Sequence, residues 1–99
     1  MKNSKVTYDV VDYGGGFKVH NWTLSVTTKQ GEKQFLLGQD AKFCVRSLRM
    51  YPEDVIKKIG GANLDNIKIQ KSLGRFIVKT LGLTESIVDN LQPWELCCQ

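Results

Sequence analysis

The sequence is poor in the residues on which most small enzymes and metal proteins depend. Its 99 residues include one histidine, His20, two prolines and three cysteines. A single imidazole leaves little scope for a Cys–His or Ser–His pair, and the cysteines lack the local spacing of metal ligands. The adjacent Cys97 and Cys98 would form a strained disulfide, and three cysteines cannot all pair internally. We therefore expect no enzyme activity, no cofactor and no bound metal.

The sequence also lacks long apolar runs, internal repeats and low-complexity segments. No uninterrupted apolar stretch is long enough to cross a bilayer, so we expect no contact with a membrane. The first residues, Met1–Lys5, contain no apolar stretch like that of a secretion signal. Together with unpaired cysteines, this favours a cytoplasmic protein with reduced thiols. A chain of this length has room for a single domain, residues 1–99.

Acidic residues are the minority, and arginine is scarce. Fourteen basic residues against ten acidic ones give a formal net charge of +4, and only three of the basic residues are arginines. A positive balance favours acidic partners such as nucleic acid or an acidic protein face, although it also keeps a small protein soluble. Lysine-rich surfaces suit loose phosphate contacts better than bidentate reading of bases.

The first half of the chain predicts a meander of three antiparallel strands. The strands are expected at residues 5–12, 17–29 and 33–38, with turns at Gly14–Gly16 and Gln30–Glu32. Alternating β-branched and aromatic residues favour strands, and the glycines supply the backbone conformations that tight turns need. A strand as long as the second is prone to a bulge that would switch its buried face midway.

The second half predicts helices, on the evidence of caps and breakers. The expected helices cover about 41–50 after Asp40, 52–59 before Gly60, 72–81 before Gly82, and a short segment from Thr84 to Leu91. Residues 66–70 fit either a short strand or the start of the next helix. The predicted fold class is α+β, a three-stranded antiparallel β-meander followed by a helical C-terminal half packed on one sheet face.

Residues 74–91 resemble a helix–turn–helix motif. Gly82 stands at the turn, Thr84 caps the second helix, and Val88 and Leu91 would anchor it. The resemblance implies a DNA-reading face made of Thr84, Glu85, Ser86, Asp89 and Asn90. Two features depart from the motif, because Val78 replaces a small residue and two acids on the reading face would repel phosphates. A plain αα-hairpin has the same turn chemistry.

Four basic residues are spaced so that a helix would place them on one face. They are Lys68, Lys71, Arg75 and Lys79. This stripe would dock phosphates or an acidic protein patch, or it is simply the solvated face of an amphipathic helix. The interpretation requires residues 68–71 to be helical.

A second candidate surface lies on the second strand. Period two places Lys18, His20 and Trp22 on one face, next to Tyr13 and the glycine turn. A cation, an imidazole and an indole in a row can stack on bases or grip a partner loop, whereas the alternative places Trp22 in the core. A hairpin does not require three glycines, so the tip around Gly15 is a candidate contact loop.

Two functional hypotheses follow. The first is a small non-enzymatic module that binds a larger intracellular protein, such as one that handles nucleic acid, and modulates or inhibits it. Inhibitors of this size are typical of phages and mobile elements. Its partner-binding residues would be Tyr13, Gly15, Lys18, His20, Trp22, Lys68, Lys71, Arg75 and Lys79.

The alternative is a DNA-binding regulator that uses residues 73–91 and forms a dimer through its sheet. Under the first hypothesis as well, the protein could bind nucleic acid through its Lys/Arg face. A homodimer is left open in both cases, because the third strand is an edge that can pair with another copy.

Overall fold

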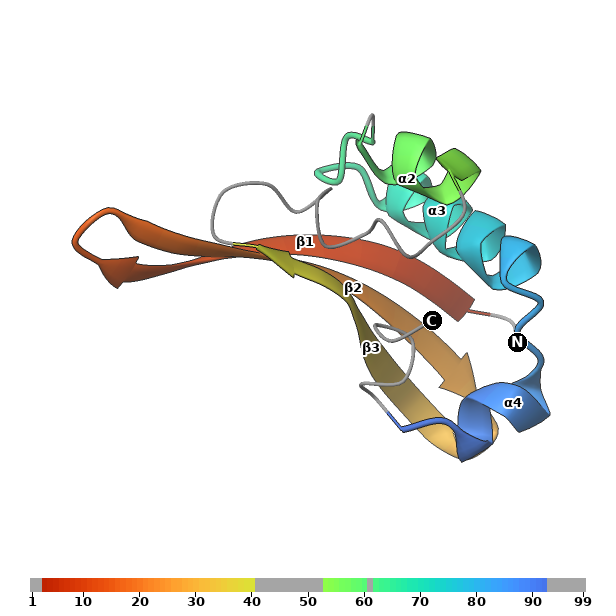
Figure 1. The fold of residues 1–99 in the computed structure, drawn as a ribbon. Helices are drawn as coiled ribbons and strands as arrows, with labels where there is room; N and C mark the ends of the chain where they lie inside the picture. Colours follow the sequence, from red (N-terminus) through yellow and green to blue (C-terminus); the bar gives the residue numbers. More distant parts are fainter. Residues whose placement is uncertain (1–2, 41–52, 61, 93–99) are drawn as a thin grey trace.

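The chain folds into an antiparallel sheet accompanied by helices (Figure 1). The computed structural model describes residues 3–40, 53–60 and 62–92. Within these ranges the strands are β1 (Asn3–Gly14), β2 (Phe17–Thr28) and β3 (Gly31–Asp40), and the helices are α2 (Glu53–Gly60), α3 (Ile67–Thr80) and α4 (Glu85–Asn90). The strand order is β1-β2-β3, with antiparallel neighbours. The predicted α+β class with an antiparallel sheet is confirmed.

Some finer predictions are not tested by the described residues. The helix expected at about 41–50 lies outside them, and so does the tail with Cys97 and Cys98. A total of three strands therefore holds for the described part, and for the whole chain it stays a prediction.

From Trp22 to Val26 the buried face of β2 does not switch, and the side chains of Val19 and His20, which would show an earlier switch, lie outside the description. Trp22, Leu24 and Val26 are all buried, and they alternate on one face. The register between β2 and β3 does shift, but the extra residue is Leu37 on β3, which lies between the partners of Trp22 and Thr23. A bulge on the partner strand bends the sheet there without turning the side chains of β2 over.

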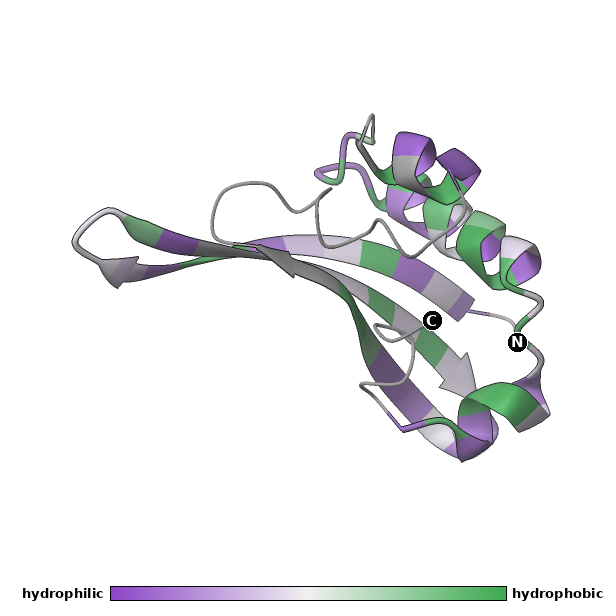
Figure 2. Ribbon diagram, in the orientation of Figure 1, coloured by the Kyte–Doolittle hydropathy of each residue, from purple (hydrophilic) through white to green (hydrophobic). Residues whose placement is uncertain are grey.

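The core lies between this face of the sheet and the helices. Fully buried side chains come from all three described strands and from each helix: Val6, Leu24, Val26, Phe35, Leu37, Val55, Ile59, Ile77 and Val88. Bands of apolar and polar residues alternate along the strands in Figure 2, as a half-buried sheet requires. The predicted packing of helices on the sheet follows from this shared cluster.

Residues 67–70 are helical, so this segment is the start of α3 and not a short strand. Asn66 caps α3, because its Oδ1 accepts a hydrogen bond from the backbone N–H of Lys68 at 2.9 Å. The N–H of Gln70 then donates to the carbonyl of Asn66 at 3.0 Å. The single helix of 14 residues that results carries the whole basic stripe.

α3 packs directly against the backbone of β1. A Cβ placed on the buried Gly74 would lie 2.5 Å from the backbone nitrogen of Lys5 and 2.6 Å from the carbonyl carbon of Ser4. No side chain fits in this space. Gly74 therefore fixes how closely the helix approaches the strand.

The predicted end of α3 and start of α4 are both confirmed. The N–H groups of Gly82 and Leu83 donate to the carbonyls of Lys79 and Val78, the paired bonds of a Schellman motif. Thr84 then caps α4, since its hydroxyl accepts from the N–H of Ile87 at 3.3 Å. α4 packs against β2 at the end of the sheet where β2 turns into β3 (Figure 1).

Candidate partner-binding surfaces

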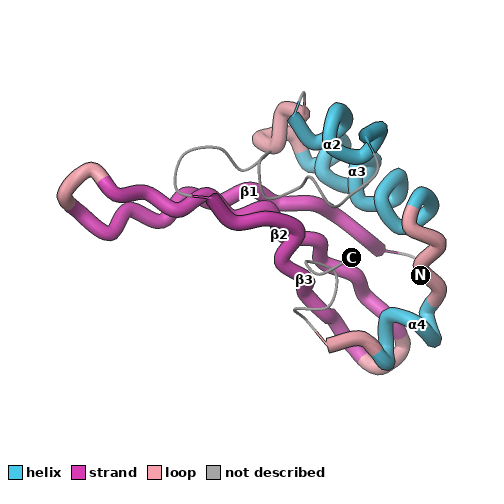
Figure 3. The backbone as a smooth tube through the Cα atoms, in the orientation of Figure 1, coloured by secondary structure: helices cyan, strands magenta, loops and turns pink. Residues whose placement is uncertain are grey.

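The most exposed part of the described structure is the hairpin formed by β1 and β2. Among the described residues, these strands pair with each other as far as Gly14 and Phe17, whereas β3 pairs with β2 only as far as His20 and Asp40. Residues 10–20 therefore form a two-stranded projection, which we call the hairpin arm. It extends beyond β3 and away from the described helices (Figure 3).

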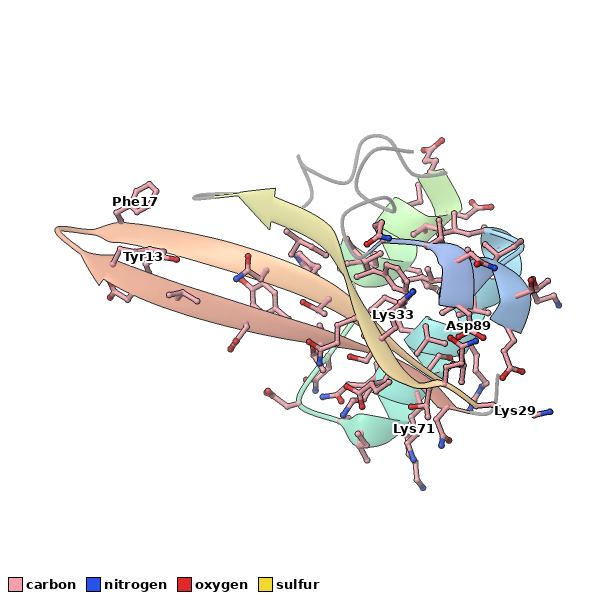
Figure 4. All side chains as sticks on the ribbon, turned by 90° about the horizontal axis from the view of Figure 1, so that it is seen from below. Tyr13, Phe17, Lys29, Lys33, Lys71 and Asp89 are labelled. Atoms are coloured by element: carbon pink, nitrogen blue, oxygen red, sulfur yellow. The ribbon has the colours of Figure 1, made fainter. Side chains whose placement is uncertain are left out.

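Apolar side chains gather on this arm. Of the seven large hydrophobic residues that are exposed in the described ranges, Val10, Val11, Tyr13 and Phe17 lie on the arm, and Tyr8 lies at its base. Tyr13 is 67% exposed and Phe17 is 53% exposed, and their ring centroids are 6.0 Å apart. Figure 4 shows these two rings at the outer end of the arm. The arm thus presents an aromatic pair to solvent.

The backbone conformation and one hydrogen bond fix the turn at the tip of the arm. Gly15 and Gly16 both have positive φ, 61° and 78°, as turns that match the twist of a hairpin demand. The carboxylate of Asp12 accepts a hydrogen bond from the N–H of Gly14 at 2.8 Å. Tyr13 is the extra residue where the register shifts between Asp12 and Gly14. The turn and the bulge together bring Tyr13 and Phe17 to the same end of the ribbon.

Some residues of the predicted strand surface are exposed in the structure, and one, Trp22, is buried. Tyr13, Gly15 and Lys18 are exposed on the arm, as expected. Trp22 as a contact residue is wrong, because it is only 8% exposed and its ring packs 4.7 Å from that of Tyr8. His20 lies in β2 opposite Val10, and its side chain falls outside the description.

Sequence reasoning missed Phe17, Val10 and Val11. Val10 and Phe17 follow the alternation of a half-buried strand, so their pattern gives no sign that they are exposed. The available signal was the position of Phe17 directly after Gly16, since residues that flank a hairpin turn lie far from the middle of a sheet.

The second surface is the outer face of α3. Its four basic residues, Lys68, Lys71, Arg75 and Lys79, are all exposed, and the helix contains no acidic residue. In the part of the chain that the structure describes, the one ion pair joins Lys57 to Glu53 on α2, at 3.2 Å. The four cations of α3 therefore have no carboxylate partner among the described residues. The condition set by the sequence for this stripe, a helix through residues 68–71, is met.

α4 uses most of the residues that the helix–turn–helix resemblance assigned to DNA. Glu85 accepts from the backbone N–H of Lys29 at 2.9 Å, and Asp89 accepts from the hydroxyl of Thr28 at 2.6 Å. Thr84 is the cap of the helix. Ser86 and Asn90 are exposed, and Asn90 donates to the carbonyl of Ser86 at 2.8 Å. The two acids thus hold α4 to the β2–β3 turn.

Lys33 completes this attachment, and sequence reasoning missed it. Its Nζ donates to the carbonyls of Val88 at 3.0 Å, Asp89 at 3.0 Å and Leu91 at 2.6 Å, at the C-terminal end of α4. A cation at this end of a helix satisfies carbonyls that have no partner within the helix and complements their dipoles. We call these contacts, with those of Glu85 and Asp89, the α4 clasp. Lys33 and Asp89 are labelled in Figure 4.

Comparisons of the chain with protein-family models, with curated proteins and with solved structures give no match. Among the described helices, none is both long and apolar enough to span a bilayer. Within the same residues, no three His, Cys, Asp or Glu side chains lie together as ligands of one metal ion would.

Proposed function

We propose that this protein is a small, non-enzymatic binding module that docks on a larger protein through its hairpin arm and modulates or inhibits that protein. The observation that carries the proposal is the exposed aromatic pair, Tyr13 and Phe17, at the end of a projecting ribbon. The proposed contact residues are these two rings together with Val11, Gly15 and Lys18. A cytoplasmic location is part of the proposal, as the composition favours.

The energetics of the arm support a partner. Two-stranded ribbons are marginally stable in water, and clustered apolar side chains on a surface mark interaction sites. Burying an aromatic side chain of this size contributes about 1.5–3 kcal/mol. Tyr and Phe lose few rotamers on binding, which is one reason why aromatic residues are enriched in interfaces. The partner would thus gain affinity from the side chains that the fold leaves uncovered.

The basic face of α3 is proposed as a second contact region. Four exposed cations on a helix without acids would favour an acidic face of the partner, or the nucleic acid that such a partner handles. Contacts of exposed lysines are individually weak and depend on salt. We therefore assign the main share of the affinity to the arm.

A DNA-binding regulator is the weaker candidate. A recognition helix needs its reading side chains available in the groove. Here Glu85 and Asp89 bind the β2–β3 turn, and α4 packs mainly on β2. Ser86 and Asn90 are the exposed members of the set that remain. Sequence-specific DNA binding that is lost in Asn90→Ala would revive this candidate.

The test is affinity capture of interacting proteins from a lysate of the organism that encodes the chain, after nuclease treatment. We expect one protein to be retained at near one-to-one stoichiometry by the wild-type chain. The double variant Tyr13→Ser/Phe17→Ser should weaken its binding more than tenfold, because aromatic residues at the centre of an interface typically contribute about 2 kcal/mol or more.

The matched control is Ile87→Ser, which removes an exposed apolar side chain from α4 instead of from the arm. It should retain the partner at the wild-type level. Recovery that is equal for the arm variant and the wild type would sink the proposal, and so would recovery of nucleic acid alone, lost on digestion.

A further inference from the structure

A pocket lies between α2 and α3, on the side of the molecule that carries the basic stripe. Its volume is about 440 Å³, and it is lined by Lys58, Ala62, Lys68, Ile69, Ser72 and Leu73. Leu73 is nearly buried, while Ala62 and Ile69 are half-buried and form the rest of an apolar floor. This volume lies in the range of pockets that accept small ligands or apolar side chains.

Two lysines lie at the edge of this apolar floor. Both Lys58 and Lys68 are exposed, and the Nζ of Lys58 lies 5.3 Å from the ring centroid of Phe76. Contact with the ring face holds this ammonium group beside the pocket without neutralising it. The nearby ion pair of α2 uses Lys57, so Lys58 and Lys68 keep their charges uncompensated among the described residues. Lys68 belongs to both the pocket and the basic stripe.

We infer that this pocket, which we call the α2–α3 groove, binds an acidic segment of a protein partner that inserts one apolar side chain between the two lysines. The apolar floor would hold the side chain, and carboxylates on either side of it would meet Lys58 and Lys68. The remaining cations of the stripe, Lys71, Arg75 and Lys79, extend the positive surface along α3 for the flanking acids.

The apolar floor is what favours an acidic peptide over nucleic acid. A phosphate backbone needs cations but has no group that gains from Ile69 and Leu73. An amphipathic peptide satisfies both halves of the site, in the way that short segments commonly bind grooves through spaced apolar anchors. The groove lies on the helices and the arm on the strands, so this inference does not depend on the arm.

The experiment is an NMR titration of the ¹⁵N-labelled full chain with a synthetic acidic peptide that carries one central leucine, and with the same peptide carrying alanine there. We expect shifts of amides around the groove, at Lys58, Ala62 and residues 68–73. The leucine peptide should bind about tenfold more tightly than the alanine peptide, because the anchor loses its contact with the floor.

Two variants with the same charge change separate the groove from general attraction. Lys68→Gln should weaken binding of the leucine peptide about threefold, whereas Lys29→Gln, at the exposed turn between β2 and β3, should leave it unchanged. Equal affinities for the two peptides, or an equal effect of the two variants, would overturn the inference in favour of diffuse electrostatic binding. Shifts spread over the surface, no binding, or displacement by single-stranded DNA of equal charge would overturn it as well.

The arm variant Tyr13→Ser/Phe17→Ser distinguishes this inference from the proposed function. It should bind the leucine peptide like the wild type even though it no longer retains the captured protein. Loss of capture with retained peptide binding supports both ideas, and retained capture with peptide binding at the groove contradicts only the role of the arm.

Discussion

The two hairpins of the sheet share strand β2, but they differ in their contacts with the described helices. The β2–β3 hairpin is attached to α4, because Thr28, Lys29 and Lys33 are all hydrogen-bonded in the α4 clasp. The β1–β2 turn at the other end of β2 has no described helix against it and exposes Tyr13 and Phe17 (Figures 1 and 4).

The chemistry of the two ends differs as well. At the clasped end Lys33 satisfies helix carbonyls and two acids of α4 bind the turn, whereas at the bare end two aromatic rings are exposed. Exposed aromatic side chains contribute little to the stability of a monomer, and clusters of them mark interaction sites. This contrast is what we expect if the clasped hairpin serves the fold and the bare one serves the proposed partner.

The largest expected effect concerns two glycines, one in the folded body and one on the arm. Gly74→Ala should lower the free energy of unfolding by about 3 kcal/mol, because its Cβ would overlap the backbone of β1. Gly15→Ala should cost only about 1 kcal/mol, since open space surrounds it and only its positive φ resists the change. Urea unfolding measures both, and equal losses would mean that the arm is as integral to the fold as α3.

Removing the central cation of the clasp is the next test. Lys33→Met should destabilise the protein by about 2 kcal/mol, because three carbonyls at the end of α4 lose their donor. Lys29→Met is the matched control, as the side chain of Lys29 is exposed on the same hairpin. It should change stability by less than about 0.5 kcal/mol. If the two variants unfold at the same urea concentration, the clasp does not hold α4.

Double-mutant cycles sharpen the comparison between the two ends. Thr28 and Asp89 should be coupled by about 1 kcal/mol through their 2.6 Å hydrogen bond. Asp12 and Lys18 face each other across the arm without an ion pair in the described structure, so their coupling should be close to zero. The cycles use Thr28→Val with Asp89→Ala, and Asp12→Ala with Lys18→Ala. Comparable coupling at both ends would remove the distinction drawn here.

The smallest expected change in stability is that of the arm variant. Tyr13→Ser/Phe17→Ser should alter the free energy of unfolding by no more than about 0.5 kcal/mol, because both rings are mainly in solvent. A loss of 2 kcal/mol or more in urea unfolding would show that the rings support the fold, and it would remove the reason to assign them to a partner.

The elements that depend on neighbouring residues could be predicted from the sequence. The strands follow from alternation and from the glycines between them, and the cap of α4 follows from Thr84. The start of α3 was also accessible, because Asn66 is a typical N-cap that precedes apolar residues at helical spacing. Residues 66–70 also alternate as a short strand does, so the sequence fits both structures.

The features that depend on distant residues could not be predicted. Asp89 meets Thr28 across 61 positions of the chain, and nothing local tells an acid that reads DNA from one that holds a turn. Trp22 and Phe17 lie on the same strand with similar patterns, yet one is buried and the other exposed. The point at which β3 and the helices cease to cover β2 decides this difference, and it is set by tertiary packing.

The most direct test of the contrast between the hairpins is amide hydrogen exchange, measured on the chain alone and bound to its captured partner. We predict rapid exchange for residues 11–17 in the chain alone and slow exchange for the strand residues next to the β2–β3 turn. In the complex, the arm should become protected while the clasped end stays unchanged. An arm that is already as protected as the clasped hairpin, or protection that appears on α4 and not on the arm, would contradict the account.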